Sequence, residues 1–461
     1  MFDNLLYQNV GQLLAEDVQH NRLPQSMLFS GPQGAGKLTA ALELGRVLSC
    51  RETPKGRWVC TCPSCLRHKS LSHSELLLMG PRDCLLEIQA SRAAFEDAVA
   101  SGAKHLTAVR YLFVRSIRKL VSRFNPILWE GDDTRISKAA PLVADINELL
   151  EELDPLRALP AEKVLQKSVE SLITLCGKLE DGFLYDTIPV SQIRNAAAWA
   201  HIAPSGNRKV LVIENADRMQ ESARNALLKI LEEPPKDAIF ILTTSRRGAV
   251  MPTILSRLRT YGFIDRTPQA QQEVISRVFH AKGAGRNEKG EMRREEGEGS
   301  NEQGEMRRGE AYGNLGDYLH SFLPVAPKEL ERFAALFLRD VLERTAREGR
   351  RTSAALEQAV SSVLAESGEG AELPVEDIPS FIINQTKNFE PRVLFRIFLT
   401  GIVRVLRYSL RLPEACARDY QISSRWTQVV GAALEHVTVY NQSPQAALEL
   451  LSAELGEALE I

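Results

Sequence analysis

A glycine-rich segment near the start of the chain carries the residues needed to hold a phosphate group. Gly31, Gly34, Gly36 and Lys37 follow the pattern G-x-x-x-x-G-K, which predicts a phosphate loop between a strand and a helix. Glycines let successive backbone N–H groups turn toward phosphate oxygens, and the lysine adds a positive charge. We therefore expect this loop to bind the phosphates of ATP or ADP.

The residue after the loop lysine departs from the pattern of magnesium-dependent nucleotide hydrolases. That position requires Ser or Thr, because its hydroxyl ligates the Mg²⁺ that accompanies the nucleotide. Here it is Leu38. Thr39 follows one residue later, about 100° around a helix, and is not expected to reach the same point. The sequence thus predicts a defective Mg²⁺ site.

A second buried strand should carry the acidic residues of the same site. The mostly apolar run 209–213 is followed by Glu214 and Asn215, where a hydrolase would place Asp and then Glu. An asparagine cannot accept a proton from an attacking water, so the general-base role is lost at this position. Asp217 is expected to be a helix cap or a surface acid. Together with Leu38, this change predicts a nucleotide-binding fold that does not hydrolyse ATP.

Cysteines cluster after the helix that follows the phosphate loop. The cluster consists of Cys50, Cys60, Cys62 and Cys65. Four thiolates are a typical ligand set for structural Zn²⁺ and leave no open position for catalysis. One intervening residue between two of the cysteines is a tight spacing, so His68 or His73 is an alternative fourth ligand. We expect a structural zinc module over about residues 50–68.

A surface arginine is the last candidate for chemistry. Arg257 ends the segment Pro-Thr-Ile-Leu-Ser-Arg, which follows the strand expected to end near Thr244. It is either an ordinary surface arginine at a helix start or a charge presented to the γ-phosphate of a neighbouring subunit, where it would accelerate ATP cleavage.

The elements that must position these residues indicate an α/β domain followed by an all-α domain. Residues 1–84 and 183–262 alternate strands and helices, which predicts a parallel, doubly wound sheet. Amphipathic helical patterns dominate residues 85–182, which we interpret as a helical insertion. A lid region over 263–326 contains a segment, 281–310, too rich in glycine and charge to bury a core, so we expect a disordered loop there. Residues 327–461 are helical again.

The first long helix of the insertion is basic. Its cations are Lys104, Arg110, Arg115, Arg118, Lys119 and Arg123. A solvated helix face is one interpretation, and contact with a DNA backbone is the other.

Composition limits the remaining options. The 461 residues are 44% hydrophobic and 25% charged, which excludes collagen-like and wholly disordered chains. The 57 Lys+Arg against 59 Asp+Glu give a net charge of −2, so any contact with nucleic acid must be local. There is no signal-peptide pattern and no apolar run of about 18 residues. We expect a soluble, cytoplasmic protein without a membrane partner.

One stretch carries a family resemblance. Asn225–Pro235, Asn-Ala-Leu-Leu-Lys-Ile-Leu-Glu-Glu-Pro-Pro, resembles a signature of bacterial DNA polymerase III clamp-loader subunits, which belong to the AAA+ family. The phosphate loop, the cysteine module and the Ser-Arg segment fall in the family's order around it. The resemblance covers residues 1–80 and 185–262. The segment 85–182 and the loop 281–310 lie outside the pattern recognised, and a C-terminal match near 441–451 is weak.

Within that family the chain is most similar to the stationary, delta-prime type of subunit. The resemblance implies that Arg257 is a trans-acting arginine finger, that Thr244 lies near the sensor-1 position, and that the C-terminal helices form a collar. Leu258 follows Arg257 where the family usually has cysteine. The implied role is a subunit of a DNA polymerase holoenzyme with little or no ATPase activity of its own. Its implied partners in a hetero-oligomer are the gamma/tau and delta subunits, the sliding clamp and primer–template DNA.

Three other functions stay open at this point. The chain could be a diverged gamma/tau motor subunit, or an independent ATPase that uses Lys37, Thr39 and Asp217 in a shifted geometry. A nucleic-acid adaptor that binds through the basic helix is the third.

Overall fold

The chain folds into two compact units. A computed structural model describes residues 1–206, 208–281, 314–350, 352–366, 377–386, 393–438 and 442–459. The units are Met1–Leu319 and His320–Ile461, against the predicted start of the C-terminal domain at residue 327. The predicted disordered loop, 281–310, lies almost wholly outside the described residues.

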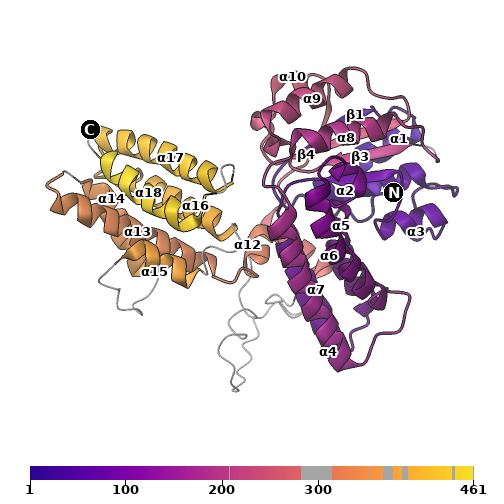
Figure 1. Cartoon of the computed structure of the whole chain (residues 1–461), viewed down its shortest axis with the longest axis horizontal. Coiled ribbons are helices and arrows are strands. Elements are labelled where there is room, and N and C mark those ends of the chain that lie inside the picture. The colour runs from indigo at the N-terminus through magenta and orange to yellow at the C-terminus, as the bar shows by residue number, and fades with distance from the viewer. Residues whose placement is uncertain are drawn as a thin grey trace. The chain divides into compact units, whose positions relative to one another are not determined.

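Unit 1 is built on a five-stranded parallel sheet with the strand order β2-β3-β4-β1-β5 (Figure 1). The strands are β1 Ser26–Ser30, β2 Leu76–Met79, β3 Lys209–Ile213, β4 Ala238–Thr244 and β5 Arg259–Gly262. The parallel α/β sheet is therefore confirmed. Strands β1, β3 and β4 are buried apolar runs, as expected for parallel strands covered on both faces. Strands β2 and β5 were not predicted, because each has four residues and β5 is a mostly exposed edge.

The helices of unit 1 outside the insertion precede, connect or follow the strands. They are α1 Val10–Gln19, α2 Lys37–Ser49, α3 Pro63–Lys69, α8 Val190–His201, α9 Glu221–Glu232, α10 Pro252–Leu255, α11 Pro268–Val278 and α12 Leu315–His320. Short 3₁₀ turns lie at η1 Pro126–Trp129, η2 Ala216–Arg218 and η3 Arg247–Ala249. The apolar side chains of β1, β3 and β4 pack against α1 and the Ala/Leu face of α2. This packing places the loop between β1 and α2 at the carboxyl edge of the sheet.

The helical insertion contains four long helices (Figure 1). They are α4 Leu85–Ser101, α5 Leu106–Ser122, α6 Asp133–Glu152 and α7 Glu162–Phe183. Helix α4 packs on α5 and α7, and α6 packs on α7. The C-terminal end of α5 reaches back to the sheet, so the insertion contributes side chains to the edge that carries the phosphate loop.

Most cations of the basic helix α5 and its two flanks are engaged within the protein. Of the six predicted cations only Lys104 is exposed, and Arg110 and Arg123 are buried. The bonded pairs are Arg110 with the carbonyls of Glu152, Leu153 and Arg157, Arg115 with the carbonyl of Lys69, Arg118 with the carbonyl of Ser70, Lys119 with the carboxylate of Glu87, and Arg123 with the carboxylate of Glu214. The interpretation as a solvated face is therefore wrong for these five cations, because three of them satisfy carbonyls at the ends of neighbouring helices and two pair with carboxylates. Contact with a DNA backbone stays a prediction.

Unit 2 is helical throughout its described residues. It contains α13 Pro327–Arg347, α14 Ala354–Glu366, α15 Ile378–Gln385, α16 Val393–Ser409, α17 Ala417–Thr438 and α18 Pro444–Glu457. Its core is aromatic: Phe337 and Phe398 meet edge to face at 5.7 Å, and Trp426 is fully buried. None of the helices described in either unit has the length and apolarity needed to span a bilayer.

Candidate functional site

The phosphate loop has a backbone that only glycine allows at several positions. A Cβ added to Gly31 would lie 2.4 Å from the carbonyl oxygen of Phe263, so a side chain cannot fit. Gly34 and Gly36 have φ values of +74° and +91°, in the left-handed region where other residues are strained. The backbone geometry of the loop thus by itself requires glycine at these positions.

Lys37 is buried and turned into its own loop. Its Nζ donates to the carbonyl oxygen of Gly31 at 2.7 Å and also to that of Pro32. Burial lowers the pKa of Lys37 to about 8, against the opposite effect of the Glu214 and Asp217 carboxylates. The ammonium therefore keeps its charge at neutral pH, and a phosphate would take the place of these two carbonyls.

An arginine that the sequence analysis did not predict donates hydrogen bonds to backbone carbonyls of the phosphate loop. Arg266, four residues beyond the end of β5, donates to the carbonyl oxygens of Gly34 at 2.8 Å and Ala35 at 3.1 Å. It also bonds the carbonyl of Leu6. No sequence motif marks this arginine, because its role depends on β5 lying next to β1.

The carboxyl ends of adjacent strands bring the other predicted residues to the same edge. Ser30, just before the loop, pairs in register with Thr244 at the end of β4. Ile213, just before Glu214, pairs with Leu242. Leu38 and Thr39 lie in the first turn of α2, which begins at the loop lysine.

Glu214 is already paired with a cation from the insertion. The guanidinium of Arg123 donates to Glu214 Oε2 and also to Cys84 Sγ. Burial alone would lower the pKa of Arg123, but the neighbouring Cys84, Glu214 and Glu180 groups outweigh it, so the pKa lies above its ordinary value. Because Glu214 is engaged by Arg123 and Leu38 has no ligand atom, this donor set does not fit a nucleotide-bound Mg²⁺.

Glu180 of α7 completes the buried charge cluster. Its carboxylate accepts hydrogen bonds from the backbone N–H groups of Asp83 and Cys84 at 2.8 and 3.0 Å. Burial nevertheless raises the pKa of Glu180 to about 7. The loop before α4 and the end of α7 are thereby joined beside Arg123.

Asn215 occupies a backbone position that suits its residue type. Its φ and ψ of 51° and 54° are left-handed, a region that Asn tolerates better than most residues. Its N–H donates to Thr243 Oγ1 at 3.2 Å.

Asp217 is not the surface acid or helix cap predicted from the sequence. Its side chain is buried, and its carboxylate accepts from Thr244 Oγ1 at 2.7 Å and from Arg246 Nε at 2.9 Å. The Thr244 oxygen also accepts from the backbone N–H of Arg246 at 3.0 Å. Both the carboxylate of Asp217 and the hydroxyl of Thr244 are therefore committed to structure at the end of β4.

The four cysteines come together in space. Their Sγ atoms all lie within 4.8 Å of one another, and Cys50 Sγ is 3.8 Å from Cys60 Sγ. A tetrahedron with Zn–S bonds of about 2.3 Å has S–S edges of about 3.8 Å, so the cluster has the size of a tetrathiolate site. Burial raises the pKa of Cys62, but hydrogen bonds from the Arg51 and Cys65 backbone outweigh it and lower the pKa to about 7. These four residues could bind a metal ion.

The two alternative histidine ligands lie as a stacked pair instead. The rings of His68 and His73 are 4.1 Å apart, and neither ring belongs to the cysteine cluster. Burial, followed by the charges of His73 and nearby arginines, lowers the pKa of His68 to about 3, so this ring is neutral at physiological pH.

Arg46 supports the cysteine cluster and was missed by sequence reasoning. It is fully buried in α2, binds both carboxylate oxygens of Glu43 at 2.6 and 2.9 Å, and donates to Cys65 Sγ at 3.3 Å. It also donates to the carbonyls of Gly56 and Arg57. A buried cation beside four thiolates offsets their negative charge.

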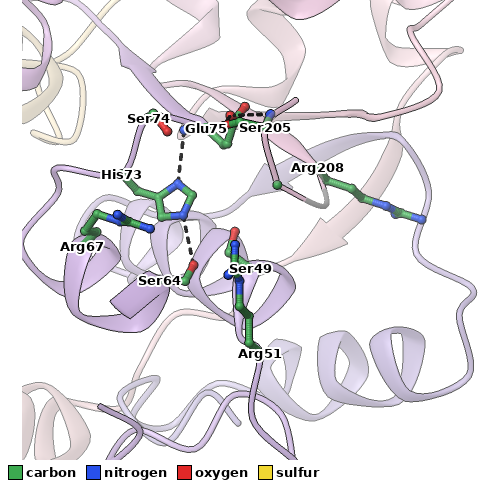
Figure 2. Close-up of a pocket in the computed structure, with 10 residues that line it drawn as sticks. Ser49, Arg51, Ser64, Arg67, His73, Ser74, Glu75, Ser205 and Arg208 are labelled. Carbon is green, nitrogen blue, oxygen red and sulfur yellow. Dashed lines mark hydrogen bonds between the residues drawn. The ribbon is translucent and has the colours of Figure 1, made fainter. Parts of the chain in front are cut away.

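A polar pocket separates the cysteine module from the sheet (Figure 2). The N–H of Glu75 donates to His73 Nδ1 at 3.1 Å, so the proton of this ring sits on Nε2, which lies 3.0 Å from Ser64 Oγ. The carboxylate of Glu75 accepts two hydrogen bonds from Ser205. Figure 2 shows Arg208 directed away from these groups. The pocket is mixed in charge, and its inner polar groups mainly bond one another.

Arg257 lies on the surface just after α10. Its Nη2 donates to Glu232 Oε1 at 2.7 Å, and its Nη1 donates to the carbonyl of Thr253 at 2.7 Å. A longer bond of 3.4 Å joins Nη1 to Ser256 Oγ. Glu232 is the last residue of α9 and belongs to the signature stretch, so the signature meets the Ser-Arg segment in space.

Comparisons with known proteins agree on one family. A family model described as "DNA polymerase III, delta subunit" matches residues 7–123 and 159–266. The matched ranges include much of the helical insertion, so the expectation that this segment lies outside the family pattern was wrong for 85–123 and 159–182. The unmatched part between them is 124–158.

Curated relatives match over a limited part of the chain. A DNA polymerase III subunit delta′ of Haemophilus influenzae is 38% identical over 104 residues, 22% of this chain and 30% of that protein. A DNA polymerase III subunit gamma/tau of Mycobacterium tuberculosis is 35% identical over 95 residues, 20% of this chain and 16% of that protein. The chain thus spans less than a third of these relatives' lengths. A solved gamma subunit-related protein of Thermotoga maritima covers 59% of this chain and 81% of its own, with 17% identity and a TM-score of 0.25.

Proposed function

From the premise that this chain is a member of the DNA polymerase III clamp-loader family, we propose that it is a non-motor, delta-prime-like subunit. In this role it would join gamma/tau and delta subunits in a hetero-oligomer that places a sliding clamp on primer–template DNA during replication. It would supply Arg257 to the ATP bound by a neighbouring subunit.

The observation that carries the proposal is the state of Glu214. This is the one carboxylate directly at the end of β3, and a buried arginine of the insertion engages it. With Leu38 beside the loop lysine, neither a magnesium ligand nor a general base is in place. Purified chain should therefore not turn over ATP, whereas it can still cradle phosphates of ATP or ADP through the loop N–H groups and Lys37.

The proposed work of Arg257 is electrostatic. Its guanidinium would approach the γ-phosphate held in the neighbouring subunit and stabilise the negative charge that builds up on the equatorial oxygens during transfer. Its surface position just after the short helix α10, with part of the side chain exposed, supports presentation to a neighbour. The arginine makes and breaks no covalent bond.

Zn²⁺ is the proposed occupant of the cysteine cluster, with Cys50, Cys60, Cys62 and Cys65 as ligands. The ion would cross-link the segment between α2 and α3 and would supply no catalytic chemistry, since all four positions are taken. Arg46 would balance the charge of the site. The residues of the loop between α2 and α3 would then be held against α2 by the metal.

The test is ATP turnover by the complex assembled with the motor subunits that co-purify with the tagged chain. Arg257→Ala should lower turnover at least about tenfold and leave assembly intact. Arg247→Ala removes another exposed arginine near the same edge and should leave turnover unchanged. Normal turnover with Arg257→Ala would contradict the proposed finger.

A gamma/tau-like motor is the second candidate, because gamma/tau and tau proteins match the chain at an identity similar to that of the delta′ proteins. ATP hydrolysis by the isolated chain distinguishes the motor from the non-motor subunit. Steady ATP hydrolysis with Mg²⁺ that Lys37→Ala abolishes would favour the motor, and its absence would favour the non-motor subunit.

A further inference from the structure

Glu232 is the acidic partner of the surface arginine, and the proposed function gives it no role. It ends α9 and lies next to Glu233, which has the same side chain and is also exposed. Only Glu232 reaches Arg257, with Oε1 at 2.7 Å from Nη2. Glu232 and Glu233 thus have the same side chain and differ in whether that side chain contacts Arg257.

The contacts of Arg257 define an orientation. Acceptors from two elements hold its guanidinium: Glu232 at the end of α9, and Thr253 and Ser256 within and just after α10. A guanidinium has five N–H donors in one plane. The three bonds use three of them, so two donors remain for an incoming phosphate.

We propose that Glu232 is a positioning residue, which fixes the guanidinium of Arg257 in one orientation and leaves its two remaining N–H donors available to a phosphate of the neighbouring subunit. This inference rests on the proposed function, because it assigns a task to the partner of the proposed finger. Glu232 itself touches no phosphate.

The physical reason is the freedom of an arginine side chain. Without a partner, a surface arginine samples many rotamers, and few of them point its planar fork in one direction. A charge-assisted hydrogen bond donated by the guanidinium to a carboxylate at a helix end selects one orientation. Because Arg257 keeps two donors, the carboxylate orients it without consuming its capacity to bind phosphate.

The experiment uses the assembled complex and measures kcat and KM for ATP. Glu232→Ala should lower kcat about three- to tenfold, less than Arg257→Ala, because the arginine is present but poorly oriented. KM should change less than about twofold, since the nucleotide is held by the neighbouring subunit. Glu233→Ala removes the adjacent carboxylate and should leave both constants unchanged.

Two further variants separate positioning from a structural or long-range charge effect. Glu232→Gln keeps an oxygen acceptor and should retain more than half of the kcat. The double variant Arg257→Ala with Glu232→Ala should be no slower than Arg257→Ala alone, because the two residues act through one group.

Each of the following results would overturn the positioning role of Glu232. A normal kcat with Glu232→Ala, when Arg257→Ala is slow, would overturn the positioning role and leave the finger standing. An equal loss with Glu233→Ala, or a Glu232→Gln variant as slow as Glu232→Ala, would also overturn it in favour of a general charge effect. A normal kcat with Arg257→Ala would overturn both proposals.

Discussion

Two Arg–Glu pairs lie in the same α/β unit, and they differ in burial. Arg123–Glu214 joins the insertion to the end of β3, with side chains 5% and 20% exposed. Arg257–Glu232 joins α10 to α9, with side chains 33% and 52% exposed. The chemistry of the two pairs is the same, and their surroundings decide what each can do.

Burial makes the Arg123–Glu214 pair energetically costly to break. Two charges in a low-dielectric interior lose their hydration, so removing one partner leaves the other uncompensated. The exposed pair is screened by water and exchanges partners at little cost. The buried arginine thus keeps Glu214 engaged, whereas the exposed arginine can exchange its partner, as the proposed finger role requires.

A third pair, Arg46–Glu43, is buried on both sides and extends the comparison. Its arginine has a further contact with Cys65. In this pair the buried arginine instead contacts the four-cysteine cluster.

The largest expected effect comes from breaking the buried pair at β3. Arg123→Met should lower the free energy of unfolding of unit 1 by about 3 kcal/mol, because it leaves Glu214 without its counter-charge. Urea denaturation of the full chain measures this. Arg92→Met breaks an exposed pair in the same insertion and should cost less than about 0.5 kcal/mol. Equal effects of the two variants would show that burial does not separate the pairs.

The next effect concerns the pair beside the cysteines. Arg46→Met should weaken zinc binding about ten- to hundredfold, because removal of a group that bonds a metal ligand typically has this cost. Competition with a chromophoric chelator measures the affinity. Lys69→Met removes another cation, one that bonds only the Cys60 carbonyl in this region, and should have a smaller effect. An unchanged zinc affinity of Arg46→Met would remove Arg46 from the support of the site.

The third prediction is that ADP binding depends on pH through the buried Lys37. The pKa of Lys37 is lowered to about 8, so its ammonium is charged below that pH and neutral above it. Phosphate binding needs the charge, so ADP affinity should fall about tenfold between about pH 7.5 and pH 9. Fluorescence titration with a labelled ADP at both pH values tests this. Lys37→Met should bind weakly with a flat profile, and a flat profile in the unaltered chain would contradict the lowered pKa.

The smallest expected effect is on the stability of the exposed pair. Arg257→Met should change the free energy of unfolding by less than about 0.5 kcal/mol, because exposed ion pairs contribute little. The same urea experiment provides the comparison with Arg123→Met. A loss above about 1 kcal/mol would mean that Arg257 is a structural residue and would weaken its interpretation as a free surface charge.

Local patterns were enough for much of the site. The three apolar strands, the phosphate loop and the cysteine cluster were predicted because neighbouring residues in the sequence define each of them. Strand β2 was missed because Leu76–Met79 is short and lacks β-branched residues, and β5 because Arg259–Gly262 is a mostly exposed edge. Asp217 was misjudged, since its partners Thr244 and Arg246 come from the next strand.

The sequence by itself determined which atoms are present: glycines where the loop backbone is left-handed, a methyl-bearing Leu38 where a hydroxyl is needed, and four thiols close enough along the chain to meet. Only the tertiary structure decided which charges are neutralised. Arg123 and Arg266 find partners that lie far away in the sequence, and Arg46 reaches Cys65 as well as its helical neighbour Glu43. Buried polar groups need hydrogen-bond partners, and packing decides which groups are near.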